Sequence, residues 1–206
     1  MLQLFISAFV TLFVVIDPPG CAPIYAGLTA NASAKQAFSM ALRACLIATG
    51  ILLVFALFGE DLLGALHIEL DSFRIAGGIM LFLIALDMVF EKRTERREER
   101  AEKVRTAQPH VEDVSVFPMA MPMLAGPGSI ASVMLLTARA RGIEETGVIL
   151  AALVVVMVLS FVALVAARPI IRVLGAQVEA VITRLLGVLL AALAAQFVID
   201  GIQAQF

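Results

Sequence analysis

The amino-acid sequence predicts an all-α membrane protein with six transmembrane helices, arranged as two inverted three-helix repeats. Apolar residues make up 61% of the 206 residues and charged residues only 16%, whereas soluble domains carry about a quarter charged residues. Six apolar stretches each approach the length of a membrane span. In both halves, the first of the three stretches is interrupted by a cluster of proline and glycine.

The six stretches are predicted to be helices because each is close to the roughly 20 residues that a helix needs to cross about 30 Å of hydrocarbon. Open strands are excluded, since a lipid-exposed strand edge would leave backbone groups without hydrogen bonds. The predicted spans are Leu4–Leu28, Phe38–Gly59, Phe73–Phe90, Val116–Leu136, Gly147–Ala167 and Val181–Ile199.

These spans form one membrane domain that divides into two repeats, 1–90 and 114–206, joined by a polar linker, 91–113. The linker mixes basic and acidic residues, which is typical of a solvated loop or a short exposed helix. We therefore interpret it as a connection between the halves in preference to a partner-binding patch.

Lysine and arginine are distributed unevenly between the two faces that six spans define. Twelve lie on the face of the first, third and fifth loops, and three on the other face. Because basic residues favour the cytoplasmic side, the linker is predicted to be cytoplasmic and both termini to lie outside the cytoplasm. The twelve are Lys35, Arg43, Lys92, Arg93, Arg96, Arg97, Arg100, Lys103, Arg105, Arg168, Arg172 and Arg184, and the three are Arg74, Arg139 and Arg141.

Charge and cysteine content exclude several functional classes. A net charge of −2 gives no basic surface for nucleic acid. Cys21 and Cys45 lie in apolar stretches, so we expect neither a structural disulfide nor a metal site. No nucleotide-binding motif is present, and we expect no cofactor. The segment before Asp17 lacks a charged n-region and a cleavage site, so we interpret it as a retained span and not as a signal peptide.

The two halves align with an offset of about 108 to 110 residues. Pro18-Pro19-Gly20 matches Gly126-Pro127-Gly128, and Thr29 matches Thr137; Arg74 and Gly77 match Arg184 and Gly187. Because each half has an odd number of spans, the second half must enter the membrane from the opposite side. Such inverted repeats are typical of secondary transporters. The alternative is an ordinary six-helix bundle with chance similarity.

Spans one and four are predicted to be discontinuous at their Pro/Gly breaks, Asp17 to Gly20 and Ala125 to Ser129. Consecutive prolines remove backbone donors and exclude helical geometry before them. The half-helices that follow, Gly20–Ala30 and Gly128–Ala138, would point their N-termini at the middle of the bilayer. Free N–H groups and positive dipole ends would then converge at a shared polar cavity that suits a carboxylate.

This geometry makes the residues at the breaks the candidate substrate-binding residues. They are Asp17, Gly20, Cys21, Gly128 and Ser129. A carboxylate as deep in a span as that of Asp17 is costly and is usually functional, as a ligand for a substrate amine or as a proton carrier. The structural alternative is that Asp17 only caps the half-helix that follows it.

Four further polar residues are candidates for a pathway or for ion coupling: Ser7, Thr11, Asp87 and Gln196. Ser7 and Thr11 share one face of span one, but Thr11 can also bond back to a backbone carbonyl. Asp87 lies near the cytoplasmic end of span three, where an interfacial position is the simpler interpretation. Gln196 is isolated in span six and can bond across helices.

At these motifs the sequence resembles the MarC family of bacterial inner-membrane proteins over nearly its whole length. The resemblance implies a multi-pass bacterial inner-membrane protein, similar to transporters of small neutral amino acids such as glycine and alanine. The termini, which the basic residues place outside the cytoplasm, would then be periplasmic. Cys21 departs from the family pattern, which often has Asn at this position. The matching stretches are Ile16 to Gly20 with Pro23, Phe73 to Ile79, Pro118 to Pro122 and Ala125 to Ile130.

The sequence therefore favours a secondary transporter of a small neutral solute, driven by H⁺ or Na⁺, whose other partner is the lipid bilayer. The alternatives are an intramembrane enzyme and a lipid-interacting or channel-like protein. An enzyme is not expected, because His67 and His110 lie outside the spans and leave Ser129 without a base, and because the HExxH zinc pattern is absent.

Overall fold

The computed structural model describes residues 1–90, 99 and 113–205 of the chain. The described residues are almost entirely helical and contain no strand, which confirms the all-α prediction. In chain order the elements are α1 (Leu2–Ile16), α2 (Pro18–Leu28), α3 (Ala34–Ala65), α4 (Leu70–Val89), the irregular helix η1 (Ser115–Leu124), α6 (Pro127–Thr137), α7 (Ile143–Val165) and α8 (Ala167–Gln205).

Among the described residues, five helical segments are long and apolar enough to cross a membrane, with α1 and α2 together forming the first. A sixth span results if η1 and α6, which meet at an angle of 53°, form one broken span. Large apolar side chains are exposed on the long helices, for example Leu46, Leu83, Val158 and Leu185. Water would not cover such a surface favourably, whereas lipid does.

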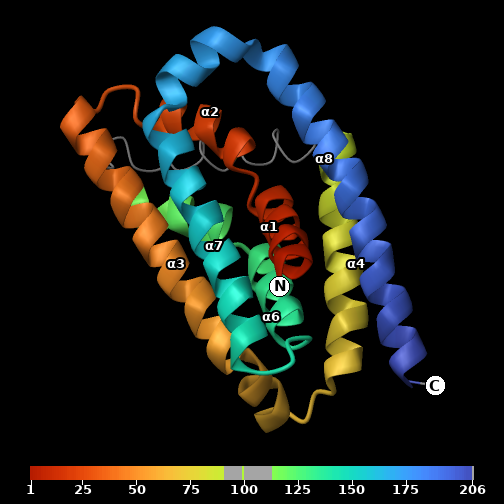
Figure 1. The fold of residues 1–206 in the computed structure, drawn as a ribbon. Coiled ribbons are helices and arrows are strands. Elements are labelled where there is room, and N and C mark those ends of the chain that lie inside the picture. Colours follow the sequence, from red (N-terminus) through yellow and green to blue (C-terminus); the bar gives the residue numbers. More distant parts are fainter. Residues whose placement is uncertain (91–98, 100–112, 206) are drawn as a thin grey trace.

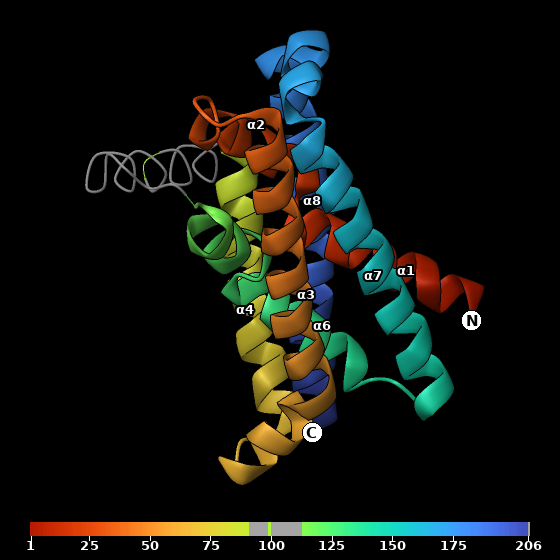
Figure 2. The ribbon, with the colours of Figure 1, turned by 90° about the vertical axis from the view of Figure 1, so that its left-hand side faces the viewer.

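The chain runs back and forth between two ends of the molecule (Figure 1). From the end where α2 lies, α3 descends and α4 returns; later η1 and α6 descend, α7 returns and α8 descends to the C-terminus. In the view turned by 90°, α1 leaves the side of the bundle at an angle, so that the N-terminus lies away from the other helices (Figure 2).

Several helices extend beyond the predicted spans because polar residues continue them. α3 begins at Ala34 and not at Phe38, since Ser33 and Gln36 form reciprocal cap hydrogen bonds. The largest difference is α8, which begins at Ala167, well before the predicted Val181. It runs across one end of the molecule before it descends beside α4 (Figure 1).

Small residues let α4 and α8 pack closely along their length. A Cβ atom built on Gly78 would lie 2.9 Å from the backbone oxygen of Ala194, and one built on Gly187 would lie 3.1 Å from that of Ala85. Both distances are shorter than an ordinary van der Waals contact. Glycine at these positions is therefore required by the approach of the two backbones, as is common between membrane helices.

Asp113 stabilises the start of η1 at the surface of the molecule. Its carboxylate accepts a hydrogen bond from the Ser115 N–H at 2.9 Å and pairs with Arg43 of α3 at 2.5 Å. Hydrogen bonding from Ser115, helped by the Arg43 guanidinium, lowers the pKa of Asp113 below its ordinary value. The stabilising effect of the carboxylate is therefore present at neutral pH and is lost as the pH falls through this lowered pKa.

Candidate functional site

Asp17 is the single residue that separates α1 from α2. Its backbone is left-handed, with φ 58° and ψ 64°, a conformation that Asp tolerates better than most residues. Pro18 and Pro19 follow at the first two positions of α2. A proline disfavours helical geometry in the residue before it, so the chain turns at Asp17. The side chain is deeply buried, with 1% of the residue exposed.

The N-terminus of α2 has its backbone donors already bonded. Pro18 and Pro19 have no N–H group. The Gly20 N–H donates to Oδ1 of Asp17 at 3.2 Å, and the Cys21 N–H donates to the Asp17 carbonyl at 3.1 Å. The structure thus differs from the expectation that the N–H groups of Gly20 and Cys21 face a shared cavity. The half-helix also begins at Pro18, two residues before the predicted start.

The break between η1 and α6 is built differently. Phe117 and Met121 are extended inside η1, because each precedes a proline. Gly126 caps α6 without a side chain, and α6 begins at Pro127, one residue before the predicted start. A Cβ on Gly126 would collide with the carbonyl oxygen of Pro122. Glycine is therefore required where the chain folds back into α6.

The N-terminus of α6 keeps free donors. The first backbone hydrogen bond at the start of α6 runs from the Ile130 N–H to the Gly126 carbonyl. Within the described part of the chain, the N–H groups of Gly128 and Ser129 and the Ser129 hydroxyl form no hydrogen bond. Ser129 is 3% exposed. Buried donors at a positive helix end are suited to an anion.

Packing brings the two breaks close together. A Cβ built on Gly128 would lie 3.4 Å from Cγ1 of Val15 and 2.5 Å from Cδ1 of Ile84. Gly128 therefore packs against the last turn of α1, at Val15, which is two residues before Asp17. It also packs against α4, at Ile84. The buried Asp17 of the first half and the free N–H donors of the second half thus belong to two breaks that pack within two residues of each other.

The predicted pathway residues of α1 do not extend this region. The Thr11 hydroxyl donates to the Ser7 carbonyl at 2.8 Å, which is the structural alternative considered for it. Ser7 itself is exposed, in the first half of α1. The Cys21 thiol donates to the Ile16 carbonyl at 3.6 Å.

Asp87 and Gln196 lie apart from each other. Gly187 of α8 is the residue that contacts Met88, so Gln196 lies about 13 Å further along α8 at 1.5 Å per residue. The Gln196 amide donates to Asp200 of the same helix at 2.6 Å and is exposed. Asp87 is partly buried near the end of α4.

Ser132 is a buried polar residue that the sequence reasoning did not single out. It is 0% exposed, and its hydroxyl has no hydrogen-bond partner among the described residues. Ser129 and Ser132 are three residues apart, so they share a face of α6. That serine spacing was visible in the sequence and would have extended the candidate site along the helix.

The histidines considered for an enzymatic site lie elsewhere. His67 is exposed in the turn after α3, and His110 lies outside the described residues. The described residues contain no group of three or more His, Cys, Asp or Glu that could hold a metal ion.

Comparison with known proteins gives one family along the full chain. The model of the "MarC family integral membrane protein" matches residues 2–206. The UPF0056 membrane protein MJ1677 of Methanocaldococcus jannaschii is 35% identical over 98% of this chain and 97% of its own length. The UPF0056 inner membrane protein YhgN of Escherichia coli is 32% identical over 96% of this chain and 95% of its own length. No solved structure matches.

Proposed function

The chain belongs to the MarC family of integral membrane proteins, and we propose that it is a secondary transporter of a small neutral solute. The solute is a zwitterionic amino acid such as glycine or alanine, and a gradient of H⁺ or Na⁺ drives its movement. The proposal assigns no chemical step to the protein.

The observation that carries this proposal is the approach of the two helix breaks inside the membrane-spanning bundle. Gly128, at the start of α6, packs against Val15, which is two residues before the buried Asp17. Discontinuous helices that meet at the middle of the bundle are the means by which many transporters bind solutes and ions.

The polarity of the two breaks suits a zwitterion. The solute carboxylate would accept hydrogen bonds from the N–H groups of Gly128 and Ser129, at the positive end of α6. Its ammonium group would lie near Asp17 or the last carbonyls of α1. Pro18 and Pro19 have no N–H group with which to donate to the carbonyls of Val14 and Val15.

The same proposal includes two inverted repeats. Helix packing supports it, because η1 and α6 pack against α3 just as α1 and α2 pack against α7, while α4 packs along α8. These contacts of α1, α2 and α4 thus have counterparts when the halves are exchanged. Thr29 and Thr137 also make equivalent hydrogen bonds, each to the carbonyl four residues before it.

We further propose that the protein lies in a bacterial inner membrane, with the 91–113 linker cytoplasmic and both termini periplasmic. The unequal distribution of Lys and Arg supports this orientation. A cysteine introduced in the linker should not react with an impermeant thiol reagent added to intact cells, whereas it should react in inside-out vesicles. Labelling of this cysteine in intact cells would show that the protein has the opposite orientation.

The transport proposal is tested by uptake into liposomes. Purified protein should accumulate labelled glycine or alanine above the level of empty liposomes, and an imposed H⁺ or Na⁺ gradient should increase the accumulation. An ionophore that collapses the gradient should abolish the increase. Absence of uptake across a panel of neutral amino acids, with either gradient in either direction, would contradict the proposal.

A further inference from the structure

Two arginines connect the half-helices α2 and α6 to opposite ends of α8. Near the start of α8, Arg168 donates from Nη2 to the carbonyls of Thr29 and Ala32, at 2.7 and 3.1 Å. Near its other end, Asp200 accepts from Nη2 of Arg139, at 2.6 Å. α8 therefore contacts the C-terminal ends of both half-helices, one at each end of the molecule.

The Arg168 contact is a cap on α2. The last carbonyls of a helix have no partner within it, and the helix dipole makes this end negative. The guanidinium of Arg168 satisfies two carbonyls beyond the last turn of α2. It joins the loop between α2 and α3 to the junction of α7 and α8.

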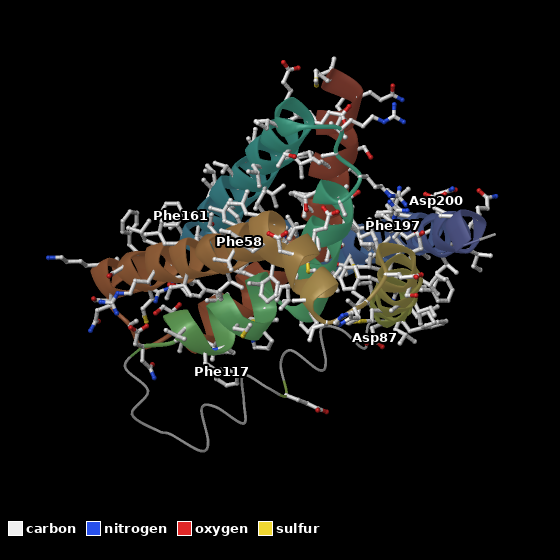
Figure 3. All side chains as sticks on the ribbon, turned by 90° about the horizontal axis from the view of Figure 1, so that it is seen from below. Phe58, Asp87, Phe117, Phe161, Phe197 and Asp200 are labelled. Atoms are coloured by element: carbon white, nitrogen blue, oxygen red, sulfur yellow. The ribbon has the colours of Figure 1, made fainter. Side chains whose placement is uncertain are left out.

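The Arg139 contact lies at the end where the chain terminates. Arg139 follows α6, and its guanidinium carbon is 4.6 Å from the centre of the Phe197 ring. Asp200 also accepts from Gln196. The Arg139 and Asp200 side chains are 35% and 29% exposed, so water can reach the pair. Figure 3 shows Phe197 and Asp200 side by side on α8.

We propose that these two contacts are the latches of the transport cycle, and that each closes one side of the bundle. This inference rests on the proposed transport function. The half-helices α2 and α6 carry the two breaks that form the candidate site. Separation of α6 from the end of α8 would admit water from the side of the termini, and separation of α2 from the start of α8 would admit it from the side of the linker.

Alternating access requires that the two latches be opposed. If one conformation is open to the termini and the other to the linker, loss of one latch favours the conformation open on that side and reduces the other. Arg168 and Arg139 are thus predicted to have opposite effects on access to the same buried position. A merely structural contact would instead loosen both sides together.

Native Cys21 is the probe, because it is fully buried beside the Asp17 break. In a Cys45→Ala background, labelling of Cys21 by an impermeant thiosulfonate is measured in right-side-out and inside-out vesicles. Asp200→Asn should raise labelling from the side of the termini about tenfold, which corresponds to about 1.4 kcal/mol, and lower it from the side of the linker. Arg168→Gln should do the reverse.

Arg74→Gln is the matched control, because the Arg74 guanidinium pairs with Asp71 of the same helix at 2.6 Å. Glutamine keeps the Cβ of Arg74, which lies next to Gly201 of α8. This variant should leave both labelling rates unchanged. Exchange of the charges, Arg139→Asp with Asp200→Arg, should restore the rates of the parent protein. Equal increases in Cys21 labelling on both sides, or no change in labelling in either variant, would contradict the proposal that the two contacts are latches. Reciprocal labelling without amino acid uptake would support the latches and contradict the proposed solute.

Discussion

Asp17→Asn should reduce amino acid uptake by about 10- to 150-fold while the protein stays inserted and folded. In the proposed site the Asp17 carboxylate contacts the ammonium group of the solute. A charge-assisted hydrogen bond of this kind contributes about 1.5–3 kcal/mol, and its loss gives the stated range of binding. The measurement is the concentration dependence of uptake into liposomes, for the variant and the parent protein.

Asparagine separates the charge of Asp17 from its structural roles. Asn also tolerates the left-handed backbone, and it caps a helix about as well as Asp, so the hydrogen bond to the Gly20 N–H can persist. The unfolding temperature should therefore stay near that of the parent protein. Uptake equal to that of the parent protein would assign Asp17 to the cap alone.

Two glycines of α2 provide a matched test of the carboxylate position. A Cβ on Gly20 would collide with Oδ2 of Asp17, whereas one on Gly27 would meet nothing within 4 Å. Gly20→Ala should displace the carboxylate and reduce uptake, and Gly27→Ala should have no such effect. Equal effects of the two substitutions would show that uptake is sensitive to α2 in general and not to the Asp17 carboxylate.

Gly78→Ala should destabilise the protein by about 1–3 kcal/mol, the usual effect of overpacking, and Gly78→Val should destabilise it further. The added Cβ would lie 2.7 Å from Cγ2 of Val198, 2.9 Å from the Ala194 carbonyl oxygen and 3.0 Å from the Val198 amide nitrogen. The Val198 side chain can rotate, but the two backbone atoms can retreat only if α8 moves away from α4. The measurement is the unfolding temperature in a mild detergent.

Gly50 of α3 is the control for this substitution, because a Cβ there would meet nothing within 4 Å. Gly50→Ala should be neutral or stabilising by up to about 1 kcal/mol, since alanine favours helix more than glycine does. If both variants lost the same stability, close packing of α4 on α8 would not be the reason that Gly78 is required.

The helical class and the spans were predictable because hydropathy is a local property of the sequence. The ends of α3 and α8 were not read from it, because polar residues extend both helices past the apolar stretches. For α3 a local signal was present, the spacing of Ser33 and Gln36 that makes a capping box. For α8, the residues that extend the helix across the end of the molecule do not have the apolar pattern of a membrane span.

The two breaks were predictable as positions but not as chemical environments. Proline and glycine mark both interruptions, yet the direction of the Asp17 side chain decides whether α2 keeps a free donor. That direction depends on the left-handed backbone of Asp17. The sequence is compatible with this conformation but does not specify it. The contact of Gly128 with Val15 and Ile84 likewise depends on packing between distant segments, which no local pattern specifies.

In the proposed transporter, the unequal N-termini of α2 and α6 would limit the number of carboxylates that the two breaks can bind. Two identical breaks would provide two sets of amide donors and could accept two carboxylates. Here the first set is already neutralised by a carboxylate that belongs to the chain itself, Asp17, and only Gly128 and Ser129 remain. The stoichiometry should therefore be one solute molecule per polypeptide, despite the duplicated architecture.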